Sequence, residues 1–242
     1  MEEIKTQAIV LKAQDYKDSG KLLTIFSLEH GLMQAKINGV TKPKAKLAFA
    51  AQPFCFGEYI ITSKFTNTII NCTCIETFFE LTQDFDKFVA GMGMLEICIY
   101  LVKAEDPCVE LFLLLLKCLR LLNFSKAVPL AVLIKFTIEA LSIGGFKLKL
   151  DACKKCLDKN PTKVYFSFDN GGILCPFCAG QDDLAITMGE WATLKIIDKT
   201  NLDNFENLKF TSIDTLCETM KLLIKYFYDK TGENLSGVSA YL

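Results

Sequence analysis

Two pairs of cysteines constrain this chain more than any other feature of its sequence. Cys153 and Cys156 form a CKKC motif, Cys175 and Cys178 form a CPFC motif, and eighteen residues separate the two. Each pair brings two thiolates within one tight turn, and the intervening loop lets the second pair complete a tetrahedron. This spacing is typical of zinc sites. Because cysteine fills all four positions, we expect one structural zinc ion with no open position for water.

The residues between the two motifs predict a zinc ribbon. Val164 to Phe168 and Gly171 to Leu174 have the pattern of a short hairpin, joined by a turn at Asp169-Asn170-Gly171. Lys154 and Lys155 would offset the negative charge of a zinc ion bound by four thiolates, or they could face phosphate. On the sequence alone, an iron–sulfur cluster and four cysteines without metal are the alternatives.

Cysteine usage and the N-terminus indicate a reducing compartment. The chain has eleven cysteines, an odd number, and those outside the two motifs lie mostly in apolar stretches. Free cysteine in such a stretch packs as a small hydrophobic residue. The chain begins Met1-Glu2-Glu3, and no apolar signal segment follows. We therefore expect a cytoplasmic protein.

The densest apolar run, Val109 to Leu122, predicts a buried helix. It contains Glu110, Lys117 and Arg120, and it is shorter than the roughly 20 apolar residues that a membrane span requires. We expect this helix at the centre of a helical bundle, and no membrane association.

The first 80 residues predict β-structure. Five short runs read as strands separated by turn residues; the first alternates partly, and the last two are rich in β-branched and aromatic residues. They are Ile4 to Lys12, Leu22 to Leu28, Leu32 to Val40, Phe54 to Thr62 and Thr68 to Glu76. Five strands in so short a segment favour a small barrel or sandwich.

The period of the apolar residues becomes helical after Phe78. Helices are predicted over Leu81 to Lys103, Val109 to Leu122, Val128 to Ile143, Thr187 to Thr200 and Ser212 to Asp229. The expected organisation is α+β: a β-domain at residues 1–80 and a helical domain at 81–242 that carries the zinc module at 147–182. The polar tail, Thr231 to Leu242, is expected to fray.

A basic loop is the most plausible site for an anionic partner. Lys36, Lys42, Lys44 and Lys46 lie within eleven residues that contain no acidic residue. Such a loop between strands of a small barrel suits phosphate contacts, and a solvated loop without a ligand is the alternative. The net charge of the chain is −1, so binding to a polyanion would have to rely on a local patch.

Catalytic motifs are absent from the sequence. His30 is the only histidine, and no nucleophile elbow, phosphate-binding loop, dinucleotide fingerprint or zinc-protease motif occurs. We therefore expect a protein that is not an enzyme.

The order of these motifs resembles that of the RecO family of bacterial DNA repair proteins. The segment Val10 to Met33, VLKAQDYKDSGKLLTIFSLEHGLM, is similar to the opening of that family, in which a DY…LLT(L/I)F…EHG pattern follows a strand. A basic, glycine-containing loop then leads to Gln52-Pro53-Phe54, and Gly144-Gly145-Phe146 precedes the CKKC motif as in the family. The resemblance is strongest over residues 1–60 and 140–180.

The resemblance implies an OB-fold barrel followed by a helical domain with a zinc module. It implies binding of single- and double-stranded DNA, annealing of complementary strands, and recombinase loading together with RecR on DNA coated by the single-strand DNA-binding protein. It places the protein in the bacterial cytoplasm, at the nucleoid. Lys42, Lys44 and Lys46 correspond to the family's basic loop, with Lys36 and Lys21 as further DNA contacts. The family loop is usually rich in arginine, whereas this one carries lysine.

A second hypothesis is a zinc-containing adaptor that binds other proteins and makes little direct contact with DNA. The acidic last segment of the chain and the small net charge favour it. A degenerate enzyme is the third hypothesis, for which the sequence offers no catalytic constellation.

Overall fold

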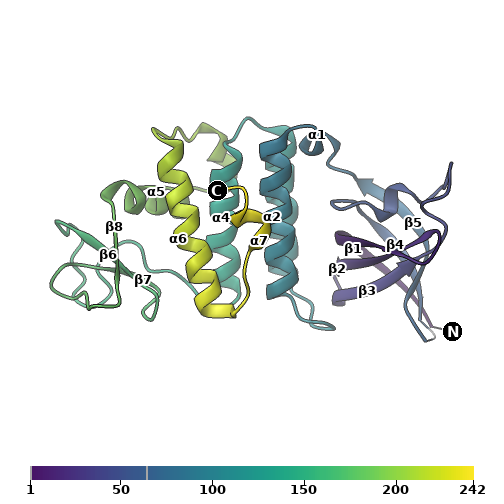
Figure 1. Ribbon diagram of the computed structural model, residues 1–242, viewed down its shortest axis with the longest axis horizontal. Coiled ribbons are helices and arrows are strands. Elements are labelled where there is room, and N and C mark those ends of the chain that lie inside the picture. The colour runs from purple at the N-terminus through teal and green to yellow at the C-terminus, as the bar shows by residue number, and fades with distance from the viewer. Residues whose placement is uncertain (1, 64) are drawn as a thin grey trace. The chain divides into compact units, whose positions relative to one another are not determined.

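The computed structural model, whose helices and strands are labelled in Figure 1, describes residues 2–63 and 65–242. The chain divides into two compact units. The first unit contains Met1–Gln83 and Leu95–Leu116, and the second contains Asp84–Met94 and Lys117–Leu242. Two helices, α2 (Phe85–Leu101) and α3 (Val109–Phe124), each contribute residues to both units.

The first unit is built on a closed five-stranded barrel with the strand order β1-β2-β3-β5-β4. Its strands are β1 (Glu2–Tyr16), β2 (Gly20–Ser27), β3 (Gly31–Ile37), β4 (Phe56–Ser63) and β5 (Thr68–Glu76), and a short 3-10 helix, η1 (Phe49–Ala51), precedes β4. Among the described residues of the barrel, β3 and β5 pair in parallel and the other neighbouring strands pair antiparallel. All five predicted strands are present, and the predicted OB-like barrel is confirmed.

Strand β1 closes the barrel because it is long enough to pair on both sides. Its first half pairs with β4 from Glu2 to Ile9, and its second half pairs with β2 from Ala8 to Tyr16. A register shift between Val10 and Lys12 marks a bulge, which bends the strand where it changes partner. The sequence predicted a shorter strand here, since the polar residues after Lys12 resemble a turn.

Small and β-branched side chains fill the barrel, and aromatic side chains cover part of its outside. The interior holds residues such as Val10, Ile25 and Ile61, and the Tyr59 hydroxyl donates to the Ala50 carbonyl at 3.1 Å. On the outer face, the ring of Phe112 in α3 meets the rings of Phe26 and Phe56 edge to face. The N-terminal half of α3 therefore belongs to the barrel's own packing.

The second unit is a helical bundle whose central helix is α4 (Pro129–Ile143), not α3 as predicted. Every residue of α4 from Leu130 to Ile138 is buried. In α3, by contrast, the side chains of Val109, Leu113 and Phe124 are exposed. The prediction placed the most apolar helix at the centre of a single bundle. It was wrong because the residues of α3 are divided between two units.

Further helices complete the bundle, namely α5 (Met188–Lys199), α6 (Ile213–Thr231) and the short η2 (Leu202–Asn207) and α7 (Ser236–Ser239). The one-turn helix α1 (Phe79–Thr82) belongs to the first unit. The predicted capping box at Thr187 and Glu190 opens α5. Pro129 stands in the first turn of α4, as predicted.

The C-terminal tail does not fray. Leu235 and Val238 are fully buried, and the Tyr241 hydroxyl donates to the Asp86 carboxylate at 2.6 Å. Gly93 in α2 makes room for this docking, because a Cβ at that position would lie 2.6 Å from Val238. The prediction was wrong because the apolar residues of the tail are few, so that their spacing gave no helical signal.

The zinc module predicted at 147–182 contains two strands of a small sheet with the order β7-β6-β8, and the third strand, β8, lies beyond the predicted end of the module. The strands of this sheet are β6 (Val164–Ser167), β7 (Gly172–Leu174) and β8 (Leu184–Ile186), and the predicted hairpin joins β6 to β7. Phe166 packs edge to face on Tyr226 of α6, with ring centroids 5.5 Å apart. The indole N–H of Trp191 donates to the Leu150 carbonyl at 2.7 Å, which ties α5 to the start of the module.

Candidate metal centre and nucleic-acid interface

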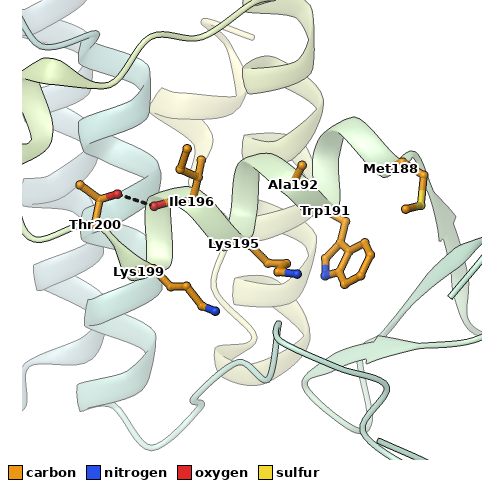
Figure 2. Close-up of a pocket in the computed structure, with 7 residues that line it drawn as sticks. All are labelled: Met188, Trp191, Ala192, Lys195, Ile196, Lys199 and Thr200. Carbon is orange, nitrogen blue, oxygen red and sulfur yellow. Dashed lines mark hydrogen bonds between the residues drawn. The ribbon is translucent and has the colours of Figure 1, made fainter. Parts of the chain in front are cut away.

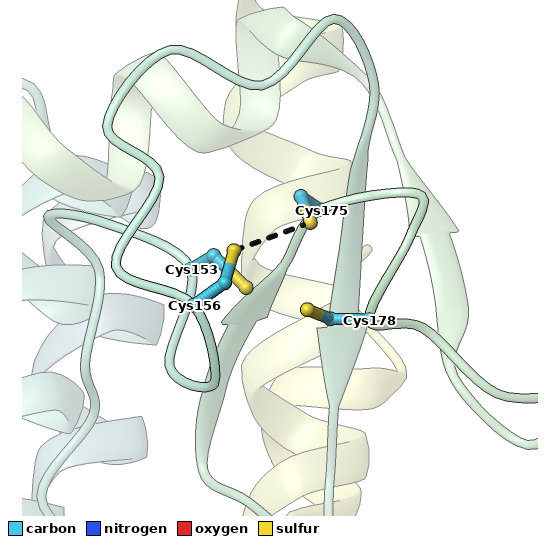
Figure 3. A group of neighbouring side chains, drawn as sticks. All are labelled: Cys153, Cys156, Cys175 and Cys178. Carbon is cyan, nitrogen blue, oxygen red and sulfur yellow. Dashed lines mark hydrogen bonds between the residues drawn. The ribbon is translucent and has the colours of Figure 1, made fainter.

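The thiols of Cys153, Cys156, Cys175 and Cys178 meet at one point of the zinc module. Figure 3 shows the four sulfur atoms directed toward one another, and all four Sγ atoms lie within 4.8 Å of each other. The Sγ atoms of Cys156 and Cys175 are 3.6 Å apart. Sulfur ligands at about 2.3 Å from a tetrahedral ion lie about 3.8 Å from each other. The four-cysteine group therefore has the size and donor set to hold one metal ion, as predicted.

Backbone hydrogen bonds close a turn at both cysteine knuckles. In the first, the Cys153 carbonyl accepts from the Leu157 N–H at 2.9 Å, and the Cys153 N–H donates to the Asp158 carbonyl at 2.8 Å. In the second, the Cys175 carbonyl accepts from the N–H groups of both Cys178 and Ala179 at 3.0 Å. Each knuckle is thus a closed turn, and its two sulfur atoms both face the sulfur atoms of the other knuckle.

The electrostatics of the four thiols favour a cation among them. Burial opposes ionisation of the Cys153 thiol, but hydrogen bonds from backbone N–H groups of Cys156, Cys175 and Lys155 lower its pKa to about 6. Hydrogen bonds with the thiols of Cys175 and Cys156 raise the pKa of Cys178 to about 12. The pKa values of the two thiols are thus shifted in opposite directions, and a cation bound among the sulfur atoms would favour the thiolate form of each.

Lys154 and Lys155 connect the first knuckle to its surroundings. The Lys155 ammonium donates to the Cys178 carbonyl at 2.9 Å, and the Lys154 ammonium donates to the Asn170 carbonyl. Both side chains are nevertheless exposed. They place two positive charges around the four thiols, which fits the charge-offsetting role expected from the sequence.

The basic loop runs from the end of β3 to η1 and is fixed to the barrel by its apolar residues. Val40 and Ala50 are buried in the barrel core, and Leu47 packs against it. The Thr41 N–H donates to the Ser19 carbonyl in the β1–β2 turn at 3.3 Å. The loop thus has an ordered backbone whose apolar side chains face inward.

Lys42, Lys44 and Lys46 all point to solvent from this loop, and their side chains are exposed. Among residues 2–63 and 65–242, none of the three ammonium groups takes part in an ion pair. Between Glu29 and Glu58 the sequence contains no acidic residue. The structure therefore brings these three predicted residues together on one loop of the barrel.

The other two predicted contacts, Lys36 and Lys21, lie in strands. Lys36 alternates with the inward-facing Ala35 and Ile37, so it points outward from β3. Lys21 stands opposite Asp15 in the β1–β2 ladder, so an acidic residue neighbours it on the adjacent strand. Lys17, which sequence reasoning did not single out, lies in the turn that bonds to Thr41. Lys17 could have been identified only from the contact between the turn and the loop in space, which the sequence does not show.

Comparison with known proteins decides the family. The model described as Recombination protein O N terminal matches residues 1–78, and the model described as Recombination protein O C terminal matches residues 82–235. The chain belongs to the RecO family of DNA repair proteins.

Individual RecO proteins are similar over nearly the whole chain. The DNA repair protein RecO of Caldicellulosiruptor saccharolyticus is 30% identical over 212 residues, which cover 87% of this chain and 86% of the relative. The RecO of Caldicellulosiruptor bescii is 30% identical over 224 residues, 92% of this chain and 91% of the relative. The RecO of Acetivibrio thermocellus is 27% identical over 237 residues, which cover 97% of this chain and 94% of the relative.

Sequence reasoning missed one further feature of this RecO chain, a hollow of about 410 Å³ on helix α5. Figure 2 shows Trp191, Lys195 and Lys199 on the same side of the helix. The Lys195 ammonium lies 4.3 Å from the centroid of the Trp191 ring. Met188, Ala192, Ile196 and Thr200 also line the hollow. The spacing of Trp191, Lys195 and Lys199 along one helical face was the signal that could have found it.

Among the described residues of this RecO chain, no helix is both long and apolar enough to cross a membrane. The apolar run in α3 is a largely buried helix, as predicted, and its residues are divided between the two units.

Proposed function

We propose that this protein is a recombination mediator that binds single- and double-stranded DNA through the basic loop of its barrel. The observation that carries the proposal is the loop itself, in which Lys42, Lys44 and Lys46 are exposed on an anchored backbone with no acidic residue between Glu29 and Glu58. Phosphate groups are the ligands that such a set of ammonium groups attracts. Membership of a DNA repair family supports nucleic acid as their source.

The mechanism that we propose is electrostatic and needs no catalytic activity of the protein's own. Lysines that neutralise phosphates on two strands lower the repulsion between the strands, so that complementary bases can pair. The partners that we infer from the family resemblance are RecR, with which the protein would load recombinase, and the single-strand DNA-binding protein that coats the substrate. The site of action would be the nucleoid in the bacterial cytoplasm. We assign one structural zinc ion to the four cysteines, because a closed set of four thiolates is a common zinc environment.

Replacing Lys42, Lys44 and Lys46 together by Ala tests the basic loop. We expect binding of a labelled single-stranded oligonucleotide, followed by fluorescence anisotropy, to weaken roughly tenfold or more at low salt. Three lost phosphate contacts should also reduce the slope of log affinity against log salt by about 2. The rate of annealing of two complementary oligonucleotides should fall in parallel.

The matched control replaces by Ala three exposed lysines of the second unit, namely Lys117, Lys209 and Lys225. It removes the same formal charge elsewhere, so its binding and salt slope should stay near those of the unmodified protein. If both triple variants lose affinity equally, net charge governs binding and the loop is not the site. If neither does, the loop has no part in DNA binding.

The hollow on α5 favours a second candidate function, that of an adaptor for other proteins. Its apolar lining and the lysines beside it suit a short acidic peptide that carries an apolar side chain. The tail of the single-strand DNA-binding protein is the candidate that the family resemblance suggests. Both functions are compatible in one molecule, and we place DNA binding first because the loop is the more strongly charged feature.

A further inference from the structure

The CPFC knuckle presents an aromatic ring to solvent. Phe177 is 97% exposed, the highest exposed fraction among the large hydrophobic side chains that the structure describes. Its backbone leaves the ring little freedom to fold back, because Pro176 restricts the preceding φ and the Cys175 carbonyl closes the turn with Cys178 and Ala179. A metal bound by Cys175 and Cys178 would hold the turn still more firmly. The ring is therefore displayed on a rigid support.

The CKKC knuckle displays a second apolar side chain in the same part of the module. Leu157 is 72% exposed and has a φ of 66°, a left-handed conformation that a branched residue rarely adopts. The two knuckles touch, since the Lys155 ammonium donates to the Cys178 carbonyl, the residue next to Phe177. The turn that carries Phe177 thus has a lysine ammonium group beside it, at the metal-binding end of the module.

The lysines of the CKKC knuckle offer the tip a contact for an anionic partner, since the Lys155 ammonium lies at the Cys178 carbonyl. Asp182 and Asp183 follow the second knuckle, and the Asp183 carboxylate accepts from the Gly180 N–H at 2.7 Å. From Cys153 to Cys178 the chain carries four lysines, at 154, 155, 159 and 163, and two acidic residues. One of these acids, Asp169, lies in the β6–β7 turn, and the other, Asp158, accepts a hydrogen bond from the Asn160 N–H. An aromatic ring with ammonium groups beside it is the combination by which proteins hold single-stranded nucleic acid, through base stacking and phosphate contact.

The small apolar area of the tip distinguishes this partner from a protein. A stable protein interface buries about 800 Å² on each side around a contiguous apolar centre. From Cys153 to Cys178, among the described residues, Phe177 and Leu157 are the large hydrophobic side chains that are exposed. Two such groups match one or two bases, and they are too few for the centre of a protein interface.

We propose that the CPFC tip is a second contact for single-stranded DNA, in which an unpaired base stacks on Phe177 while the lysines of the CKKC knuckle face its phosphates. The proposal rests on the DNA binding proposed above and extends it. The basic loop belongs to the first unit and Phe177 to the second. One molecule would then have two separate contacts for nucleic acid, and two strands could be held at once.

Replacing Phe177 by Ala in the full-length, zinc-loaded protein tests the contact. Affinity for a fluorescein-labelled oligo(dT), measured by anisotropy, should fall about 5- to 100-fold, the range for removal of one stacking ring. The salt slope should stay unchanged, because phenylalanine carries no charge. Phe177→Trp should keep the affinity, and its indole fluorescence should be quenched by the oligonucleotide. Trp191, the only native tryptophan, is 5% exposed and supplies the background to subtract.

Phe124→Ala, which removes an exposed phenylalanine at the end of α3, is the matched control and should bind like the unmodified protein. Zinc content and thermal melting of all variants show whether the module stays folded. Equal affinity of Phe177→Ala, Phe124→Ala and the unmodified protein would overturn this proposal and leave the basic loop in place. Failure of the unmodified protein to bind oligo(dT) would overturn both proposals. Normal DNA binding by Phe177→Ala with loss of RecR binding would make the tip a protein contact instead.

Discussion

Gly31 shows how much a single residue contributes to the barrel. It has a φ of +65°, and a Cβ on it would lie 2.4 Å from the Asp106 carbonyl oxygen. The sequence indicated a turn at His30-Gly31, which explains the positive φ. It did not indicate the close approach of the α2–α3 connection, because the contact joins residues some seventy-five positions apart along the chain.

Gly31→Ala should destabilise the protein by about 2–4 kcal/mol, the sum of a strained backbone and an overpacked contact. The measurement is the free energy of unfolding in urea. Gly39→Ala is the control, because Gly39 also has a positive φ but a Cβ on it would meet no atom within 4 Å. It should cost only about 1 kcal/mol, from backbone strain alone. Equal losses for the two variants would show that the contact with Asp106 contributes nothing.

At the scale of elements, periodicity predicted which segments form strands and helices. It did not predict which other elements each of them pairs with or packs against. The capping box before α5 and Pro129 in α4 fixed two helix starts from local chemistry alone. The double pairing of β1 and the docking of α7 depend on partners distant in sequence, so that no local pattern reports them. The cysteine site was predictable for the opposite reason, since its ligands come from two short motifs joined by one hairpin.

Helix α5 offers a test of the adaptor function. Ile196 lines the hollow and is exposed. Ile196→Asp should weaken binding of a peptide with the tail sequence of the single-strand DNA-binding protein at least about tenfold, because it removes an apolar contact and repels an acidic ligand. Isothermal titration calorimetry measures the affinity. Ile213→Asp, at an exposed isoleucine that begins α6, is the control. Unchanged affinity in Ile196→Asp would exclude the α5 hollow as the peptide site.

At the scale of the whole molecule, the parts differ in what holds them together. The barrel is a closed hydrogen-bonded sheet around its own apolar core. The zinc module has strands of three or four residues, and the buried cluster at its metal end consists of Cys153, Leu174 and Cys175. So small a core supplies little stability without a metal, which in comparable sites contributes about 10–16 kcal/mol.

Removal of the metal with a chelator should therefore unfold residues 147–182 and leave the barrel intact. Amide hydrogen exchange followed by mass spectrometry should show lost protection in β6 and β7 and retained protection in β1 to β5. Addition of zinc should restore the protection. Protection in the module that survives complete metal removal would contradict the structural role of the ion.

The division of α2 and α3 between the two units determines where the chain can be cut. A fragment that ends at residue 80 contains all five strands but lacks Phe112, so the rings of Phe26 and Phe56 would be left in water. Exposed aromatic surface of this kind promotes aggregation. The smallest autonomous piece of the N-terminal half therefore extends through Leu116, and it must include a helix segment that belongs to the other unit.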